Sequence, residues 1–241
     1  MTKKIKILIW LYLILIHVFL SIVLVKTDAI SRVYEKLGIN VAKNELSRHY
    51  HIMVGFHNRI NKNMNAGSVV FIGDSITQGL AVSEVSDKSV NFGIGGDTTL
   101  GVITRLGEYT ALDKSQLIVL AIGINDLKYR NNQEIILNFI NIFERLPADI
   151  PILVSAILPV DEISSEKNNY NKRINAINTE LKKISIENSR LYFMDISKNI
   201  IDSTGNLEDK YHNGDGVHIS RLGYQVWIEY LKESILKINT K

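Results

Sequence analysis

Short apolar runs, bounded by glycine, proline or polar residues, recur along most of the chain. The three strongest cover residues 68–72, 117–122 and 150–157 and are rich in β-branched side chains. Runs of this length and composition are typical of parallel strands that are buried on both faces. Weaker runs at 90–92 and 191–194 are two further candidates. The pattern therefore predicts five strands.

Helical spacing of apolar residues is found between these runs, near 98–107, 132–146, 167–188 and 220–238. Ser220 can cap the last helix, because its hydroxyl can accept a hydrogen bond from an unpaired N–H of the first turn. Alternating strands and helices imply right-handed crossovers and a sheet covered on both faces. We therefore expect an α/β fold, a three-layer αβα sandwich around a central, mostly parallel five-stranded sheet of the flavodoxin-like type.

The N-terminus has a different pattern, an uncharged run over residues 7–25 with Lys3, Lys4 and Lys6 before it and Lys26 after it. As a helix, these 19 residues would span about 28 Å, close to the roughly 30 Å hydrocarbon core of a membrane. The excess of lysine before the run predicts an N-terminus inside the cell. Residues 1–27 are thus predicted to be a transmembrane signal anchor. The protein would be single-pass in the cell membrane, with its main domain extracytoplasmic.

A cleaved secretory signal is the alternative interpretation of this segment. The apolar core of such a signal usually spans about 7–15 residues and ends at a small-x-small site. The run here is longer, and Thr27-Asp28-Ala29 is a poor cleavage site. The anchor is therefore the preferred interpretation, and secretion after cleavage is the alternative.

The anchor also accounts for the basic charge of the 241-residue chain. Residues 1–27 contain four lysines and no acidic residue, so the remainder has 24 basic groups (28 − 4) against 25 acidic groups. A basic face for nucleic acid therefore has no support in the composition, and we expect no nucleic-acid partner. The absence of cysteine excludes disulfides, thiolate metal sites and a cysteine nucleophile. The sequence carries no signal for an oligomeric state.

Residues 28–66 are predicted to connect the anchor to a main domain at 67–241. Five side chains in this connector recur at helical spacing: Leu46, Tyr50, Met53, His57 and Ile60. His49, His51 and His57 could suggest a metal site, but no acidic or sulfur ligand accompanies them at ligand spacing. His49 and His51 would also point to different faces of a helix. We expect no metal here, and a helix that packs on the domain or serves as a stalk.

Ser75 lies in the stretch FIGDSIT, just after the first predicted strand. Ligands of open α/β sheets bind at the carboxyl ends of strands, so this serine is a candidate nucleophile. A serine hydroxyl needs a base to remove its proton, and the base must be oriented in turn. The G-x-S-x-G elbow is absent, and Asp74 and Ser75 are also ordinary turn and helix-capping residues.

Two Asp-x-x-His pairs near the C-terminus could supply the base, Asp215 with His218 and Asp209 with His212. On one turn, the carboxylate could accept a hydrogen bond from Nδ1–H and leave Nε2 free for Ser75. Context favours the pair of Asp215 and His218, because glycines flank Asp215 and His218 directly precedes a helix start. The alternative for either histidine is an ordinary loop residue.

Acyl transfer also needs donors for the oxyanion that develops in the transition state. Gly96 can present a backbone N–H ahead of a helix capped by Asp97, and Asn125 can offer its side-chain amide after the third strand. Both have ordinary alternatives as loop and capping residues. Their order at successive strand ends favours the catalytic interpretation.

Four stretches resemble the four blocks of the SGNH (GDSL-like) hydrolase family. They are FIGDSIT at 71–77, NFGIGGDTT at 91–99, GIND at 123–126 and DGVH at 215–218. The second block is especially similar to the platelet-activating-factor acetylhydrolase-like branch. The resemblance covers about residues 67–238 and leaves the anchor and connector outside.

The resemblance implies that Ser75 is the nucleophile, His218 the base and then the acid, and Asp215 the residue that orients His218. It implies oxyanion donors from the N–H groups of Ser75 and Gly96 and from the amide of Asn125. Gly96 fits better than Gly95, because the family's glycine directly precedes the aspartate. The run after His218, Ile-Ser-Arg-Leu-Gly-Tyr, also matches the family, whereas His212 has no such sequel. Asp74 and Asp97 would have supporting roles, and family members need no metal or organic cofactor.

We therefore expect a membrane-anchored serine esterase that acts on a small-molecule or polysaccharide ester. Short loops and an outward topology favour a short acyl group on a bulky alcohol, such as an O-acetylated cell-envelope sugar. A lysophospholipase or thioesterase and a sugar O-acyltransferase are the enzymatic alternatives. A non-catalytic carbohydrate-binding module on a membrane stalk is the alternative from another class.

Overall fold

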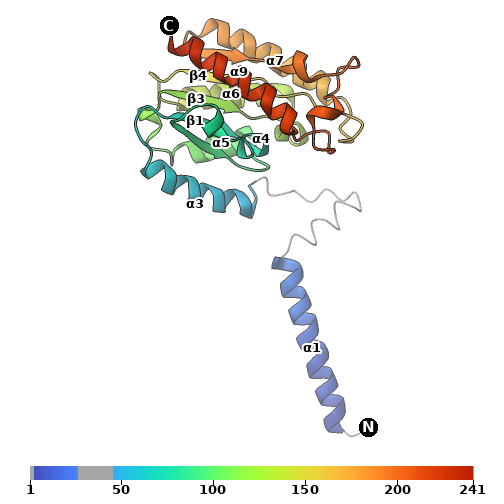
Figure 1. The fold of residues 1–241 in the computed structure, drawn as a ribbon. Helices are drawn as coiled ribbons and strands as arrows, with labels where there is room; N and C mark the ends of the chain where they lie inside the picture. The colour runs from blue at the N-terminus through green and yellow to red at the C-terminus, as the bar shows by residue number, and fades with distance from the viewer. Residues whose placement is uncertain (1–2, 27–45, 241) are drawn as a thin grey trace. The chain divides into compact units, whose positions relative to one another are not determined.

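A computed structural model describes residues 3–26 and 46–240 of the chain (Figure 1). It divides into two units, Met1–Asn44 and Glu45–Lys241. In the first unit, α1 (Lys3–Lys26) contains the segment Lys3–Ile22, which is long and apolar enough to cross a membrane. An N-terminal signal sequence can pass the same test of length and composition, so the anchor and the cleaved signal both stay predictions.

The second unit is built on a five-stranded sheet in the order β2-β1-β3-β4-β5, with every neighbouring pair parallel. The strands are β1 (Val69–Gly73), β2 (Ser89–Gly93), β3 (Leu117–Ala121), β4 (Ile152–Ser155) and β5 (Leu191–Met194). This order is that of flavodoxin-like sheets. The predicted α/β sandwich is confirmed, and both weak candidate strands form.

Helices cover both faces of the sheet, since side chains of each strand alternate between two cores. Val70 and Ile72 of β1 lie in one core with α5 (Thr99–Leu106), α6 (Asn132–Arg145) and α7 (Tyr170–Glu187). Val69 and Phe71 lie in the other with α4 (Ser75–Gln78), α8 (Ser197–Ile200) and α9 (Arg221–Asn239). Figure 1 shows α9 and α4 in front of the sheet and α6 behind it. The described part of this unit also contains four short 3₁₀ turns: Val82–Glu84, Leu112–Lys114, Asn125–Lys128 and Asp209–Tyr211.

The part of the predicted connector that belongs to the second unit contains a helix, α3 (Arg48–Lys62), whose buried residues are Tyr50, Val54, His57 and Asn61. The predicted apolar face included Ile60, which is instead 42% exposed. The polar members of the buried face explain the difference. His57 Nδ1 lies 3.0 Å from the Tyr109 hydroxyl, and Asn61 Oδ1 accepts from the N–H of Ala111 at 3.1 Å. Hydrogen bonds thus orient a helix that apolar spacing alone would have rotated.

The connection after β4 is longer than predicted, because β4 ends at Ser155 and α7 begins at Tyr170. Residues 156–158 are apolar and buried, as in a strand, but the backbone of Ile157 pairs with a side chain. The N–H and C=O of Ile157 both bond to the amide of Asn178 at 2.9 Å. At the other end of the unit, Ser220 caps α9 as predicted.

Candidate active site

The nucleophile candidate lies at the tip of β1, where the chain turns directly into α4. Asp74 caps this helix by accepting from the N–H of Ile76 at 3.0 Å, and Ser75 is its first residue. A side chain at Gly73 would come within 2.2 Å of the carbonyl oxygen of Ala121, so the turn is held tightly against β3. The Oγ of Ser75 lies 2.9 Å from Nε2 of His218. This distance allows the imidazole to accept the hydroxyl proton.

His218 is in turn oriented by Asp215. Its Nδ1 lies 2.5 Å from Oδ2 of Asp215, while Oδ1 accepts from the N–H groups of Val217 and His218 at 2.9 and 2.8 Å. Burial alone would raise the pKa of Asp215, but the hydrogen bonds from the His218 ring and the two N–H groups outweigh it and lower the pKa to about 2. The carboxylate is thus ionised at neutral pH and positioned to stabilise an imidazolium.

The second Asp-x-x-His pair has a different environment. His212 is buried, and its Nδ1 accepts hydrogen bonds from the backbone N–H groups of Gly214 and Gly216. Its Nε2 lies 3.2 Å from Oδ1 of Asp209. The geometry places the serine hydroxyl against His218, the histidine that the sequence favoured.

The candidate oxyanion donors follow β2 and β3 at the same edge of the sheet. The N–H of Gly95 already donates to Oε1 of Gln78 at 2.5 Å, which favours Gly96 as the free donor of the pair. Gly96 has φ +78° and is exposed. Asn125 donates one amide hydrogen to the carbonyl of Asp97 at 3.0 Å, and this bond fixes the orientation of its amide.

A buried arginine connects these strand ends, and the sequence analysis did not single it out. Arg105 is fully buried and pairs with Asp97, with Nη2 and Nε at 2.8 and 3.0 Å from Oδ2. Its Nη1 donates to the carbonyl of Phe92 and to the Tyr109 hydroxyl, and its Nη2 to the carbonyl of Gly73. One guanidinium thus holds β1, β2 and the Gly96–Asp97 turn together. Its only sequence signal is an arginine within an apolar helical pattern.

Of the three histidines in α3, His57 has a structural role. Burial lowers the pKa of His57 to about 3, with a further contribution from the positive charge of Arg105, so the ring is neutral. Its contact with Tyr109 extends the arginine network into α3. Among the described residues, His49, His51 and His57 are not part of a cluster with metal-ligand geometry.

Asp74 should make the stability of the protein pH-dependent. Burial raises its pKa to about 7, opposed by the N–H of Ile76 and supported by the charges of Asp97 and Asp126. The unfolded chain would have a pKa of about 3.9. Between these values the folded state binds more protons, so the free energy of unfolding falls as pH rises from about 4 to about 7.

The matched variant is Asp74→Asn, which keeps an Oδ1 acceptor for Ile76 but cannot ionise. As the pH rises from about 4 to about 7, we expect the melting temperature of the wild type to fall relative to that of Asp74→Asn. The shift in pKa corresponds to about 4 kcal/mol at most. Parallel melting curves over pH 4–8 are the measurement. An unchanged difference in melting temperature across that range would contradict the buried, proton-binding carboxyl.

Comparisons with known proteins identify the family of this chain. The model of the GDSL-like lipase/acylhydrolase family matches residues 71–226, which include Ser75, Gly96, Asn125, Asp215 and His218. The chain belongs to the GDSL-like lipase/acylhydrolase family. It is therefore a hydrolase of the GDSL (SGNH) type, as the four sequence blocks implied.

Curated relatives and solved structures place this GDSL-like hydrolase among acylhydrolases. Platelet-activating factor acetylhydrolase IB subunit alpha1 of Bos taurus is 30% identical over 189 residues, which cover 72% of this chain and 77% of that protein. The structure of a candidate platelet activating factor from Streptococcus pneumonia has a TM-score of 0.72 at 25% identity and covers 82% of this chain and 98% of that one. A carbohydrate esterase family 3 protein from Talaromyces cellulolyticus shares the fold, with a TM-score of 0.54 at 16% identity over 71% of this chain and 97% of its own.

Proposed function

We propose that this GDSL-like hydrolase is a serine esterase in which Ser75, His218 and Asp215 form the catalytic triad. One observation carries the proposal, the continuous chain of contacts from Ser75 Oγ through the His218 ring to Asp215. The contacts join the three groups in the order that a nucleophile, its base and the residue orienting that base require. Ester hydrolysis itself follows from the family, and the assignment of these residues is our proposal.

In this mechanism Ser75 attacks the ester carbonyl as His218 takes its proton. The N–H groups of Ser75 and Gly96 and the amide of Asn125 donate to the tetrahedral oxyanion. His218 then protonates the leaving alcohol, and water releases the acid from the acyl-enzyme with the same histidine as base. Every proton transfer uses a group of this chain or water.

We further propose a short acyl group as the substrate's acid part. The cavity bordered by Asp74 and Ile76, the neighbours of Ser75 in the chain, has a volume of only about 20 Å³. Two larger hollows, of about 460 and 430 Å³, are lined by residues such as Arg59 and Lys88 or Tyr192 and Lys237, none of which belongs to the proposed triad. A cavity this small, next to the turn that carries the nucleophile, has no room for a long acyl chain and favours acetyl esters. The acetylhydrolase names of the curated relatives point the same way.

The proposed alcohol part is an O-acetylated carbohydrate of the cell envelope or its surroundings. An exposed His218 and an exposed Gly96 leave room for a bulky alcohol on the outer side of the serine. Membrane anchoring through α1, with an extracytoplasmic domain, would place the enzyme near such sugars. An acetylated phospholipid is the second candidate, because the curated relatives are named for platelet-activating factor.

The test is an ester series assayed with the full chain in detergent, using p-nitrophenyl acetate, butyrate and octanoate and Ser75→Ala as background. We expect kcat/KM to fall as the acyl chain lengthens. Acetylated xylo-oligosaccharide and a 2-acetyl phospholipid then compare the two candidate alcohols. Preference for the octanoyl ester would overturn the short-acyl proposal, and preference for the phospholipid would overturn the carbohydrate.

A further inference from the structure

The loop that carries Asp215 is closed by the backbone on both sides. His212 and Ile219 pair as an antiparallel bridge, and the N–H of Asn213 donates to the carbonyl of His218 at 2.9 Å. Asp215 lies between Gly214 and Gly216, whose φ angles are +88° and +70°. Side-chain-bearing residues rarely adopt these angles. The position of the Asp215 carboxylate therefore depends on the shape of this short loop.

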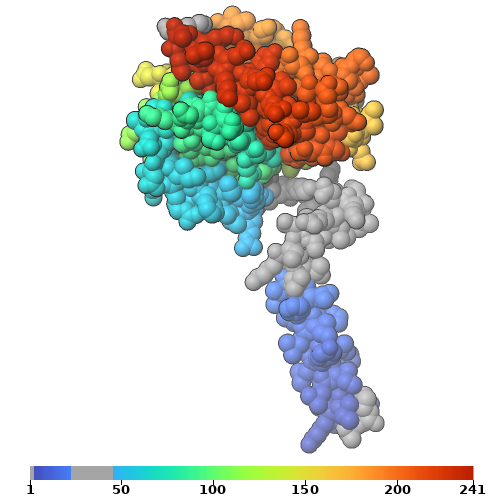
Figure 2. All heavy atoms as spheres, viewed as in Figure 1, coloured from blue at the N-terminus to red at the C-terminus, as the bar shows by residue number. Residues whose placement is uncertain are grey.

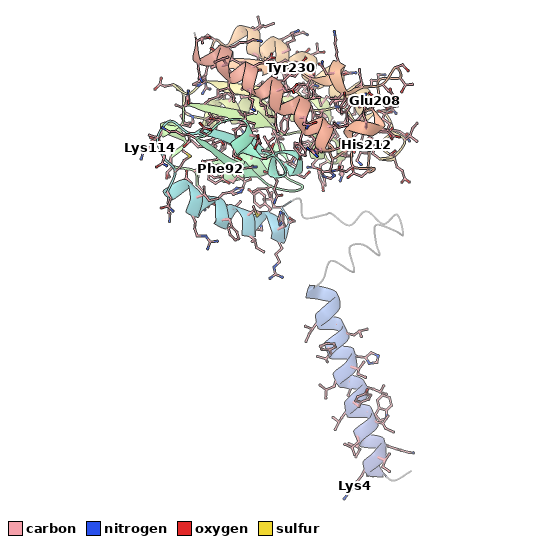
Figure 3. The ribbon with its side chains drawn as sticks, in the orientation of Figure 1. Lys4, Phe92, Lys114, Glu208, His212 and Tyr230 are labelled. Carbon is pink, nitrogen blue, oxygen red and sulfur yellow. The ribbon has the colours of Figure 1, made fainter. Side chains whose placement is uncertain are left out.

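The side chain of His212 fills the inside of the loop. It is only 6% exposed, and Figure 3 labels it near the start of α9. Its Nδ1 lies 3.0 Å from the nitrogen of Gly214 and 3.2 Å from that of Gly216. The two N–H groups that flank Asp215 thus converge on a single ring nitrogen. The ring therefore holds the peptide that joins Asn213 to Gly214 and the peptide that joins Asp215 to Gly216.

These contacts also determine where the His212 proton lies. Nδ1 accepts two N–H donors, so its lone pair is in use and the neutral ring carries its proton on Nε2. Nε2 lies 3.2 Å from Oδ1 of Asp209 and 3.8 Å from Oδ2 of Asp161, at ion-pair distance but without the alignment of a hydrogen bond. A proton facing two carboxylates is electrostatically favourable at this position.

The same assignment argues against a metal ion at this cluster. Ligand atoms of Asp161, Asp209 and His212 lie within 4.8 Å of one another, a spacing that could suit a divalent cation. A histidine ligand offers the lone pair of one nitrogen to the metal and donates the N–H of the other to an acceptor. In His212 the second nitrogen faces two donors instead of an acceptor. The donor set therefore fits a hydrogen-bonded support and not a metal centre.

The segment around Asp161 contacts the loop of Asp215 through Gly216. The N–H of Asp161, in the connection after β4, donates to the carbonyl of Gly216 at 2.8 Å. A Cβ at Gly216 would come within 2.6 Å of the Asp161 carbonyl oxygen. Gly216 is thus held between the His212 ring and the Asp161 backbone, with little room to shift.

From this geometry we infer that His212 is a positioning residue of the catalytic site, which acts by accepting hydrogen bonds from the N–H groups of Gly214 and Gly216, the residues before and after Asp215. The inference rests on the proposed function, because it assigns a role relative to the proposed triad. His212 would then support the catalytic site without acting as the general base. Asp209, whose side chain is 96% exposed, has no part in this role.

Three substitutions at His212 test the inference in the full chain with p-nitrophenyl acetate. Asparagine can place Oδ1 where Nδ1 lies, glutamine moves the acceptor by one bond, and leucine removes it. We expect kcat to fall about 10–100-fold in His212→Leu and His212→Gln, since misplacing a catalytic group by about 1 Å has effects of this size. KM should stay within about twofold. His212→Asn should recover most of the lost kcat, and Asp209→Asn should match the wild type.

The melting temperatures of the His212 variants and the activity of Ser75→Ala are measured as controls. A role in stability alone would lower the melting temperature of the variants but leave kcat equal in His212→Asn and His212→Gln, and that result would overturn the inference. The contrast between these two variants decides the question even if His212→Leu does not fold. Full activity in Ser75→Ala would instead overturn the proposed function. A loss of kcat in Asp209→Asn as large as in His212→Gln would contradict the assignment of the role to Nδ1.

Discussion

Replacing Ser75 with alanine is expected to lower kcat for ester hydrolysis by at least about 10⁴-fold while leaving the melting temperature nearly unchanged. The Oγ is the only heavy atom removed, and it contacts Nε2 of His218 at the edge of the sheet. Without it no acyl-enzyme can form. Residual activity would come from the oxyanion donors and substrate binding alone.

The assay for this prediction is the initial rate with p-nitrophenyl acetate at saturating substrate. Ser203→Ala, at an exposed serine in a turn, is the control and should retain wild-type kcat. A kcat in Ser75→Ala within tenfold of the wild type would show that another group is the nucleophile.

Replacing Arg105 with methionine is expected to lower the free energy of unfolding by about 3–5 kcal/mol, the usual cost of leaving a buried partner charge uncompensated. The guanidinium and the Asp97 carboxylate are both 0% exposed, so the charge of Asp97 would remain buried. The carbonyls of Gly73 and Phe92 would also lose a donor. For a domain of this size the melting temperature should fall by about 10 °C or more.

Arg145→Met is the matched control for this measurement. Arg145 is exposed and bonds to Asn141 in its own helix, so its replacement should change stability by less than about 0.5 kcal/mol. Urea unfolding of both variants gives the comparison. Equal midpoints for Arg105→Met and Arg145→Met would contradict a structural role for the buried arginine. At temperatures where Arg105→Met is folded, we also expect a lower kcat, because the Gly96–Asp97 turn loses its support.

The sequence was most informative where chemistry and local structure coincide. Ser75, Gly96, Asn125 and the pair of Asp215 and His218 each lie within a short block at the end of a strand or the start of a helix. Such blocks can be recognised in a sequence because the turn residues, the helix cap and the catalytic residue are adjacent in the chain. The parallel sheet then brings the blocks to one edge, and that also follows from the alternation of strands and helices.

The residues missed by sequence reasoning act through contacts between distant segments. In the sequence, Arg105 is one polar position in a predicted helix, and only the fold shows that it contacts Gly73 and Asp97. His212 appeared as a competitor of His218, since spacing alone cannot show that its Nδ1 faces two backbone N–H groups. Likewise the buried face of α3 is set by His57 and Asn61, whose partners lie about 50 positions away in the chain. Hydrophobic spacing carries no information about such pairs.

The C-terminal helix α9 connects the base to the turn that carries the nucleophile. The C-terminal segments, in orange and red, cover the upper and right-hand parts of the second unit in this view (Figure 2). Tyr224 of α9 donates to the carbonyl of Ile76 at 2.8 Å, which ties this helix to the turn that carries Ser75. Base and nucleophile, 143 residues apart in the chain, are thereby held in register.

The most direct test of the account is to identify the residue that becomes covalently modified. The full-length enzyme would be treated with a fluorophosphonate, and its intact mass and peptide masses measured beside those of Ser75→Ala and His218→Ala. We expect one adduct per chain in the wild type, located on Ser75. Ser75→Ala should take up none and His218→Ala should react far more slowly. An adduct on any other residue, or equal labelling of Ser75→Ala, would contradict the proposed mechanism.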